Sequence, residues 1–200
     1  MIVTIGREYG SGGRLIGRAL AKKMGVPFYD KEILTRAAQE SGLCPDVFER
    51  NDEKTRLSQF LTGTSYHNGA PVGAQMPINQ RVFLAQFETI SRIAEEGDCV
   101  IVGRCADYVL RERGDVFHVF LYAGEAKRTA RIMEVEGCDE NKARDLIRKT
   151  DRERKNYYNF FADGNWGNRC NYDLMLRTDG LTPEEAAELI LAAAEKKTSL

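Results

Sequence analysis

The first thirty residues contain the pattern that most constrains this chain. An apolar run at residues 1–5 predicts a buried parallel strand, and a glycine-rich segment follows it directly. Residues 15–24 then carry apolar side chains at three- and four-residue spacing, as an amphipathic helix does, and residues 26–30 predict a second strand. Together these segments form a βαβ unit. Open α/β sheets bind ligands at the carboxyl ends of such strands.

The glycine-rich segment indicates which ligand to expect. Gly10, Gly12 and Gly13 carry no Cβ, so the backbone can turn sharply and a bulky anion can approach it closely. The N–H groups at the start of the following helix favour phosphate oxygens, and Arg14 stands within reach of them. The usual phosphate-loop pattern, G-x-x-x-x-G-K-[ST], is absent, because Gly13 takes the lysine position. The segment predicts a non-standard phosphate loop, with a purely structural glycine turn as the alternative.

The composition argues against several other classes of protein. The 200 residues fit one domain, and 29 Lys and Arg against 30 Asp and Glu give a net charge of −1, so we expect no nucleic-acid partner. We expect neither a membrane helix, which needs roughly 20 apolar residues, nor a signal peptide. Five scattered cysteines and two distant histidines predict reduced thiols in a cytoplasmic protein rather than disulfides or a zinc site.

The rest of the chain repeats the alternation of strand and helix. Apolar runs at residues 99–102, 116–122 and 172–177 predict three more strands, which gives an α/β fold with a five-stranded parallel sheet. Helical patterns cover the following ranges: 31–41, 46–61, 81–96, 125–135, 139–154 and a last helix that begins at Thr182. Residues 62–79 predict a long loop, either functional or a surface excursion. His118, inside the fourth strand, is expected to be a hydrogen-bonded core residue.

Two clusters of basic residues stand out. Arg104 comes just past the end of the third strand, where ligands bind, although an ordinary surface arginine or a helix cap is the alternative. Residues 148–155 are dense in charge, and they predict either a solvated helix face or a row of cations that closes over phosphates. Arginines in such a row can stabilise a transferring phosphoryl group, because that chemistry is mainly electrostatic.

Four segments together resemble the cytidylate kinase-like family of phosphate-loop proteins. They are TIGREYGSGGRLIGRALAKKMGVPFYDKEIL, VIVGR, KTDRERKNYY and NYDLML, and the resemblance extends from residue 2 to about residue 190. It implies a three-layer P-loop fold: one domain over residues 1–200, with a nucleoside-monophosphate-binding insertion at 46–79 and a lid at 148–170. It also implies ATP and Mg²⁺, although no metal ligands are predicted.

The resemblance assigns roles to matching positions. The triphosphate of ATP would lie against Gly10, Ser11, Gly12, Gly13 and Arg14. The acceptor would be bound by Asp30, Arg81, Arg104 and Asp151, and charge on the transferring phosphoryl group would be stabilised by Arg14, Arg152 and Arg154. The chain departs from the family in two places. Its loop reads Gly13-Arg14-Leu15 instead of lysine, glycine and threonine, and Val102 replaces the aspartate before Gly103.

The resulting hypothesis is an ATP-dependent nucleoside monophosphate kinase, with CMP or dCMP as the expected acceptor. A kinase of the same fold for another small phosphoryl acceptor is the first alternative. The second is a nucleotide-binding regulator with little turnover, which the unusual loop favours. In each case the expected partners are small-molecule nucleotides, with no nucleic acid and no membrane.

Overall fold

The computed structural model describes residues 1–44, 46–48, 76–162 and 164–198. Five parallel strands form one sheet in the order β2-β3-β1-β4-β5. Their bounds are β1 (Ile2–Arg7), β2 (Phe28–Tyr29), β3 (Val100–Val102), β4 (Val116–Tyr122) and β5 (Leu174–Arg177). Strand β1 lies in the centre and pairs with both β3 and β4, so the loop after it emerges in the middle of the sheet. The predicted α/β fold with a five-stranded parallel sheet is confirmed.

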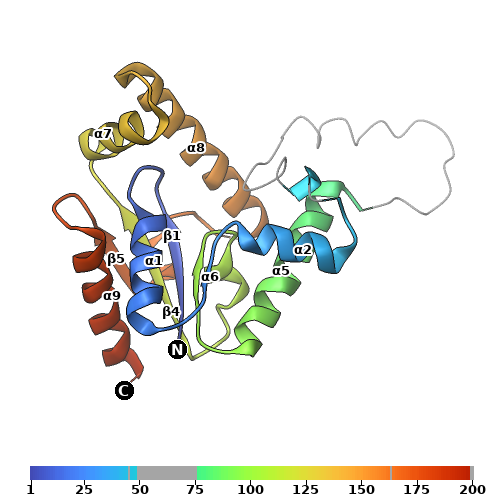
Figure 1. Ribbon diagram of the computed structural model, residues 1–200. Helices are drawn as coiled ribbons and strands as arrows, with labels where there is room; N and C mark the ends of the chain where they lie inside the picture. The colour runs from blue at the N-terminus through green and yellow to red at the C-terminus, as the bar shows by residue number, and fades with distance from the viewer. Residues whose placement is uncertain (45, 49–75, 163, 199–200) are drawn as a thin grey trace, which may run out of the picture.

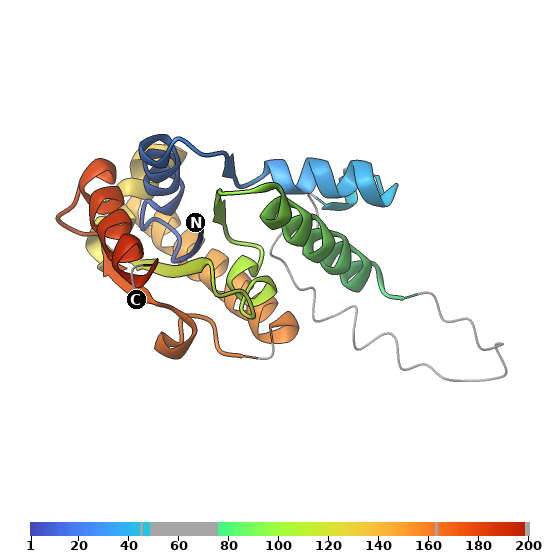
Figure 2. The same ribbon diagram turned by 90° about the horizontal axis from the view of Figure 1, so that it is seen from below.

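Helices cover both faces of the sheet (Figures 1 and 2). Helices α1 (Gly13–Met24) and α9 (Pro183–Thr198) pack on one face. The other face is covered by α2 (Glu32–Ser41), α5 (Ile78–Glu96) and α6 (Ala106–Val109). Helices α7 (Glu125–Glu136) and α8 (Glu140–Phe161) form a pair above the carboxyl end of the sheet (Figure 1), and a short 3₁₀ turn, Arg169–Asn171, precedes β5.

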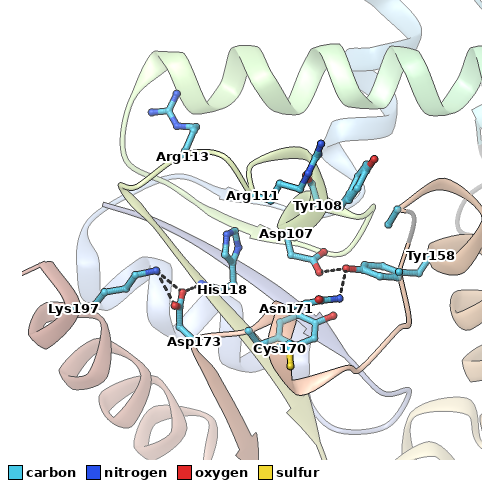
Figure 3. Close-up of a pocket in the computed structure, with 13 residues that line it drawn as sticks. Asp107, Tyr108, Arg111, Arg113, His118, Tyr158, Cys170, Asn171, Asp173 and Lys197 are labelled. Atoms are coloured by element: carbon cyan, nitrogen blue, oxygen red, sulfur yellow. Dashed lines mark hydrogen bonds and ion pairs between the residues drawn. The ribbon is translucent and has the colours of Figure 1, made fainter.

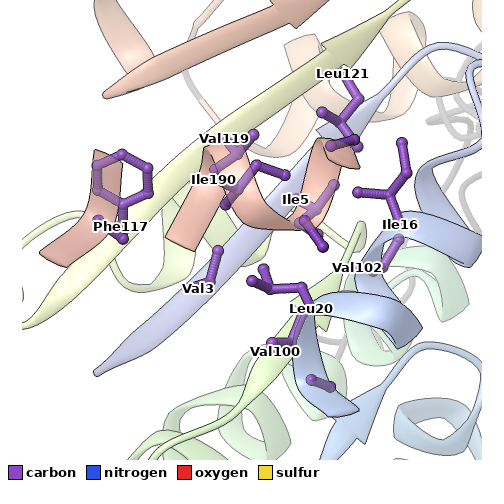
Figure 4. Packing of buried hydrophobic residues seen from close by; sticks show 14 residues of the cluster. Val3, Ile5, Ile16, Leu20, Val100, Val102, Phe117, Val119, Leu121 and Ile190 are labelled. Carbon is purple, nitrogen blue, oxygen red and sulfur yellow. The ribbon is translucent and has the colours of Figure 1, made fainter. Parts of the chain in front are cut away.

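The core has two layers because successive residues of a strand point to opposite faces. Val3 and Ile5 of β1 face α1 and α9, where they meet Leu20 and Ile190, and Figure 4 shows these side chains converging. Ile2 faces the opposite layer. Leu20 and Ile190 are both fully buried, so truncation of either to alanine would cost about 2–5 kcal/mol of stability. This packing fixes the central strand and hence the loop that follows it.

The largest difference from the predicted elements concerns α8. The predicted helix ends at residue 154, whereas α8 continues to Phe161. The extra two turns carry aromatic residues that pack against α5: Phe161 stacks on Phe83 with ring centroids 4.3 Å apart. The Tyr157 hydroxyl donates to Gln86 Oε1 at 2.9 Å. Tertiary contact therefore extends the helix past its charged stretch. The predicted helix at 46–61 and loop at 62–79 lie largely outside the described residues.

Several smaller expectations can be checked as well. Thr182 caps α9 together with Glu185, whose amide donates to the Thr182 hydroxyl at 3.2 Å. All five cysteines are free thiols, as predicted. His118 Nδ1 lies 2.7 Å from Thr4 Oγ1, so the histidine is hydrogen-bonded as expected, although it is only half-buried. In the part of the chain that the structure describes, no helix has the length and apolar character needed to cross a membrane.

Candidate active site at the carboxyl end of the sheet

The glycine loop turns from β1 into the first turn of α1. Gly10 and Gly12 have φ angles of 82° and 87°, in the left-handed region that glycine adopts without steric cost. Ser11 is fully buried between them, and its hydroxyl donates to the Glu8 carbonyl at 2.9 Å. The loop therefore wraps around the N-terminus of α1, whose first N–H groups have no partner within the helix. Such an arrangement can bind an anion.

Helices α7 and α8 hold this loop through a chain of charges. Arg128 of α7 is buried, and its guanidinium pairs with Glu8 Oε2 at 2.7 Å and with Asp151 of α8. Asp151 Oδ1 also accepts a hydrogen bond from the Tyr9 amide at 2.7 Å. Burial raises the pKa of Asp151, while the Tyr9 amide and Arg128 oppose that shift. Asp151, predicted to bind the acceptor, is thus seen to anchor the loop.

Two more arginines from the helix pair contact the loop. Arg131 of α7 donates from Nη1 to the Gly10 carbonyl at 2.7 Å. Arg154 of α8 donates from Nη1 to the Arg7 carbonyl at 3.2 Å, and its guanidinium lies 5.5 Å from the centre of the Tyr9 ring. Arg152, by contrast, is exposed and makes no hydrogen bond or ion pair with any residue that the structure describes. Of the two arginines predicted on this helix, only Arg154 lies at the loop.

A second cluster joins three of the predicted site residues. Asp30, 5% exposed, follows β2 and pairs with two arginines. Arg14 Nε lies 3.0 Å from Asp30 Oδ2, and Arg104 Nη1 binds Asp30 Oδ1 and also donates to the Val102 carbonyl at 3.1 Å. Arg104 is 2% exposed, so the alternative of an ordinary surface arginine is wrong. We call Arg14, Asp30 and Arg104 the arginine triad.

The backbone at Arg104 is held in an uncommon conformation. Gly103, Arg104 and Cys105 have φ angles of 78°, 52° and 56°, three left-handed residues in succession. A non-glycine residue in this region costs about 1–2 kcal/mol. The surrounding structure must maintain this strain, which is typical of functional sites. Arg81, the other arginine predicted to bind the acceptor, is exposed in the first turns of α5 and does not join the triad.

A third cluster surrounds a buried carboxylate on α6. Asp107 is 7% exposed, and its Oδ2 accepts from the Tyr158 hydroxyl at 2.8 Å. Asn171 Nδ2 donates to the same hydroxyl at 3.2 Å. The Tyr172 hydroxyl lies near enough for it and Asp107 to shift each other's pKa, yet it makes no hydrogen bond of normal geometry with a described residue. Burial raises the pKa of Asp107. We call these four residues the hydroxyl cluster.

Three cavities adjoin these clusters. A narrow one of about 20 Å³ lies between the loop and Gly103, with Arg7, Arg104 and Arg154 in its wall. A second, of about 320 Å³, is lined by Glu8 and by the apolar and aromatic side chains of Phe120, Tyr122, Trp166 and Met175. The third, of about 530 Å³, lies on the other side of the hydroxyl cluster, and Figure 3 shows Asp107 and Tyr158 in one wall and Lys197 in another. The hydroxyl cluster separates this largest cavity from the narrow one.

The residues present do not provide the usual protein ligand for Mg²⁺. Leu15 stands near the place where a phosphate loop has a serine or threonine, and the Ser11 hydroxyl is already bonded to the Glu8 carbonyl. Across the described ranges no three His, Cys, Asp or Glu side chains are grouped so that they could hold a metal ion. A magnesium ion at this site would have to be held by nucleotide phosphates and water, a mode that is common for Mg²⁺.

Sequence reasoning missed several residues that the structure brings to the loop. Arg128 and Arg131 lie on one face of a predicted helix, three residues apart, and that spacing was a visible signal. Asp107 and Tyr172 gave none, because their proximity depends on how α6 and the segment before β5 pack together. Both lie in walls shared by the narrow and the largest cavity.

Comparisons with known proteins give consistent results. Residues 2–180 match the model of the cytidylate kinase-like family. Cytidylate kinases of Thermoplasma volcanium and Thermoplasma acidophilum are 24% and 23% identical to the chain, over 96% and 95% of its length and 90% of theirs. An uncharacterized protein from Eubacterium ventriosum is similar in structure, with a TM-score of 0.74 at 28% identity over 98% of both chains. A shikimate kinase from Bacteroides thetaiotaomicron shares the fold, with a TM-score of 0.57 at 14% identity over 100% of this chain and 99% of its own.

Proposed function

We propose that this chain, which belongs to the cytidylate kinase-like family, transfers the γ-phosphoryl group of ATP to a nucleoside monophosphate. CMP and dCMP are the first candidates, since both curated relatives are cytidylate kinases. The observation that supports this best is the arginine triad. Two guanidiniums against one carboxylate leave a net positive charge between the glycine loop and the end of β3. That is where an acceptor phosphate would have to lie to meet a donor phosphate on the loop.

Phosphoryl transfer requires that the donor and acceptor phosphates are held in position and that their negative charge is neutralised. An oxygen of the acceptor phosphate forms a bond to the γ-phosphorus, and the bond from that phosphorus to the β,γ-bridging oxygen breaks. Its electron pair leaves with ADP, and the acceptor becomes a nucleoside diphosphate. In this proposal the loop, Gly10 to Arg14, cradles the donor, and Asp30, Arg81 and Arg104 orient the acceptor. Arg154, and Arg152 once it turns inward, stabilise charge on the equatorial oxygens.

The two cavities beside the loop suit different parts of the reaction. The 320 Å³ cavity has three aromatic residues in its lining next to Glu8 of the loop, which suits the base of the donor. The 20 Å³ cavity beside Arg104 holds little more than one water molecule, so an acceptor requires its walls to move. Arg154 and Tyr157 in those walls belong to α8. Binding of the acceptor is therefore proposed to displace α8, and closure to bring Arg154 onto the phosphates.

The test is an ADP-release assay with magnesium-ATP and CMP, dCMP, UMP, AMP, GMP or no acceptor. We expect saturable turnover with CMP or dCMP at about 1–100 per second. Arg154→Ala should lower kcat about 100-fold, since it removes a charge from the transition state. Arg148→Ala is the matched control on the same helix, because Arg148 is exposed and its nearest carboxylate oxygen, on Asp145, is 3.6 Å away. Turnover with none of these acceptors would contradict the proposal.

One observation favours a second candidate, a nucleotide-binding regulator. The loop lacks both the lysine and the hydroxyl that ordinarily serve phosphoryl transfer. Tight ATP binding, measured by calorimetry, without ADP release for any acceptor would favour the regulator. Either protein would use small-molecule nucleotides as partners, and we propose a cytoplasmic location for both.

A further inference from the structure

The space beside Gly13, where the usual phosphate loop has a lysine, is occupied by the side chain of Arg7. A Cβ added to Gly13 would lie 3.0 Å from both the Cβ and the Cγ of Arg7. These atoms are the fixed end of the Arg7 side chain, and Arg7 is paired in the sheet with Leu121 of β4, so they cannot easily move away. A side chain at residue 13 would therefore be in tight contact with the stem of Arg7, and one of the two would have to shift by a few tenths of an ångström. The contact relates the absence of a lysine at residue 13 to the presence of Arg7.

Arg7 also borders the proposed reaction site. Arg7 is half-buried at the end of β1 and lines the narrow cavity, together with Arg104 and Arg154. The Arg7 carbonyl accepts the hydrogen bond from Arg154, so the backbone at this residue is also fixed. Arg14 takes a different course: its Nε pairs with Asp30, and its side chain is 49% exposed. Of the two arginines next to Gly13, Arg7 is the one in the cavity wall.

We propose that Arg7 supplies the positive charge that a lysine at residue 13 supplies in the usual phosphate loop. In the usual loop the cation is on the residue that corresponds to Gly13, the first of α1, whereas here it would be on Arg7, the last residue of β1. Its guanidinium would bind the terminal phosphate of the donor and stabilise charge on the phosphoryl oxygens during transfer, where a planar fork of donors suits a phosphate. This inference rests on the proposed function for its catalytic part. Its binding part requires only that the loop holds ATP.

Relocating the charge provides the test. Arg7→Met keeps an aliphatic stem against Gly13 and removes the cation, and we expect it to lower kcat about 100-fold or more. Gly13→Lys alone should also lose activity, because the new stem meets Arg7. The double variant R7A/G13K removes the Arg7 Cγ, one of the two contacting atoms, and restores a cation on the helix, so it should be at least tenfold more active than Arg7→Ala. Arg18→Ala, an exposed arginine one turn further along α1, is the control and should match the parent protein.

Two readouts separate this inference from the kinase proposal. If no acceptor supports turnover, ATP affinity replaces it: Arg7→Met should weaken ATP binding about tenfold, and R7A/G13K should restore it. Unchanged turnover or, without turnover, unchanged ATP affinity in Arg7→Met would overturn the inference. The inference would also be overturned if R7A/G13K has a normal unfolding midpoint but shows no higher turnover, or no higher ATP affinity, than Arg7→Ala. If the double variant does not fold, Arg7→Lys decides, since it must retain more function than Arg7→Met.

Discussion

Two buried carboxylates at the same end of the sheet have opposite surroundings. Asp30 follows β2 and is 5% exposed, and Asp107 lies shortly after β3 and is 7% exposed. Asp30 meets two guanidinium groups, whereas Asp107 accepts from the Tyr158 hydroxyl. A buried ion is tolerated when cations pair with it, but burial beside neutral groups favours the protonated form. The partners, rather than the degree of burial, distinguish the two sites: two guanidiniums contact Asp30, whereas Asp107 is hydrogen-bonded by the Tyr158 hydroxyl.

The arginine triad and the hydroxyl cluster suit different parts of a ligand. The arginine triad adjoins the glycine loop and carries net positive charge, which suits phosphates. The hydroxyl cluster separates the narrow cavity from the largest one and offers hydroxyl and amide groups, which suit uncharged parts of a ligand. Substitution of each carboxylate by asparagine should therefore have opposite effects on stability at the two sites.

The largest effect is expected at Arg104. Arg104→Met leaves Asp30 buried with only the half-exposed Arg14 as a partner, so the free energy of unfolding should fall by about 3–5 kcal/mol in urea titrations. Arg14→Met is the matched control, and it should cost about 1 kcal/mol or less, because solvent screens the Arg14 side chain, which is 49% exposed. Equal losses in the two variants would mean that the triad is not a buried ion-pair site.

Replacement of each aspartate by asparagine should change the free energy of unfolding in opposite directions at the two sites. Because burial raises the pKa of Asp107, its contribution to stability is complete below about pH 4 and is lost as the pH rises through the folded-state value. Asparagine does not ionise, so Asp107→Asn avoids the cost of a buried charge at high pH, and its amide oxygen can still accept from Tyr158. The variant should therefore be more stable than the parent protein at pH 8, by about 1–3 kcal/mol. Asp30→Asn should be less stable at pH 8, because two guanidiniums lose their counter-charge. Unfolding measured from pH 5 to 9 tests both, and a destabilised Asp107→Asn would refute the contrast.

The smallest effect is expected at His118, which lines the 530 Å³ cavity with Asp107 (Figure 3). Burial lowers the pKa of His118, and Lys197 lowers it further, while Asp173 opposes them. The unfolded chain therefore binds the proton more readily, and stability should fall as the pH drops below about 6.5. His118→Gln should cost about 0.5–1.5 kcal/mol at pH 7 through the Thr4 hydrogen bond, and its stability should change less between pH 7 and 5. Parallel pH profiles for the two proteins would contradict this assignment.

Much of the fold could be predicted because its signals are local. The strand at residues 1–5, the glycines and the helix after them are adjacent in sequence, and Arg104 could be placed because it follows an apolar strand. The anchoring of the loop could not be predicted. The Tyr9 amide and the Asp151 carboxylate that meet there are 142 residues apart, and no periodicity connects them. The role proposed for Arg7 could not be predicted for a related reason: it depends on a steric contact with Gly13 that only the packing of β1 against α1 creates.

The continuity of α8 has a mechanical consequence. One unbroken helix of 22 residues carries Asp151 and Arg154, which contact the glycine loop, and also Tyr157 and Phe161, which pack on α5. Arg154 lies about 10 Å along this unbroken helix from Phe161, so a tilt of about five degrees at Phe161 moves it by about 1 Å. A change at the aromatic contact with α5 should therefore shift the residues of α8 that contact the loop, because one rigid helix carries both. A shift of α5 at this contact is therefore expected to move Arg154, which contacts the loop.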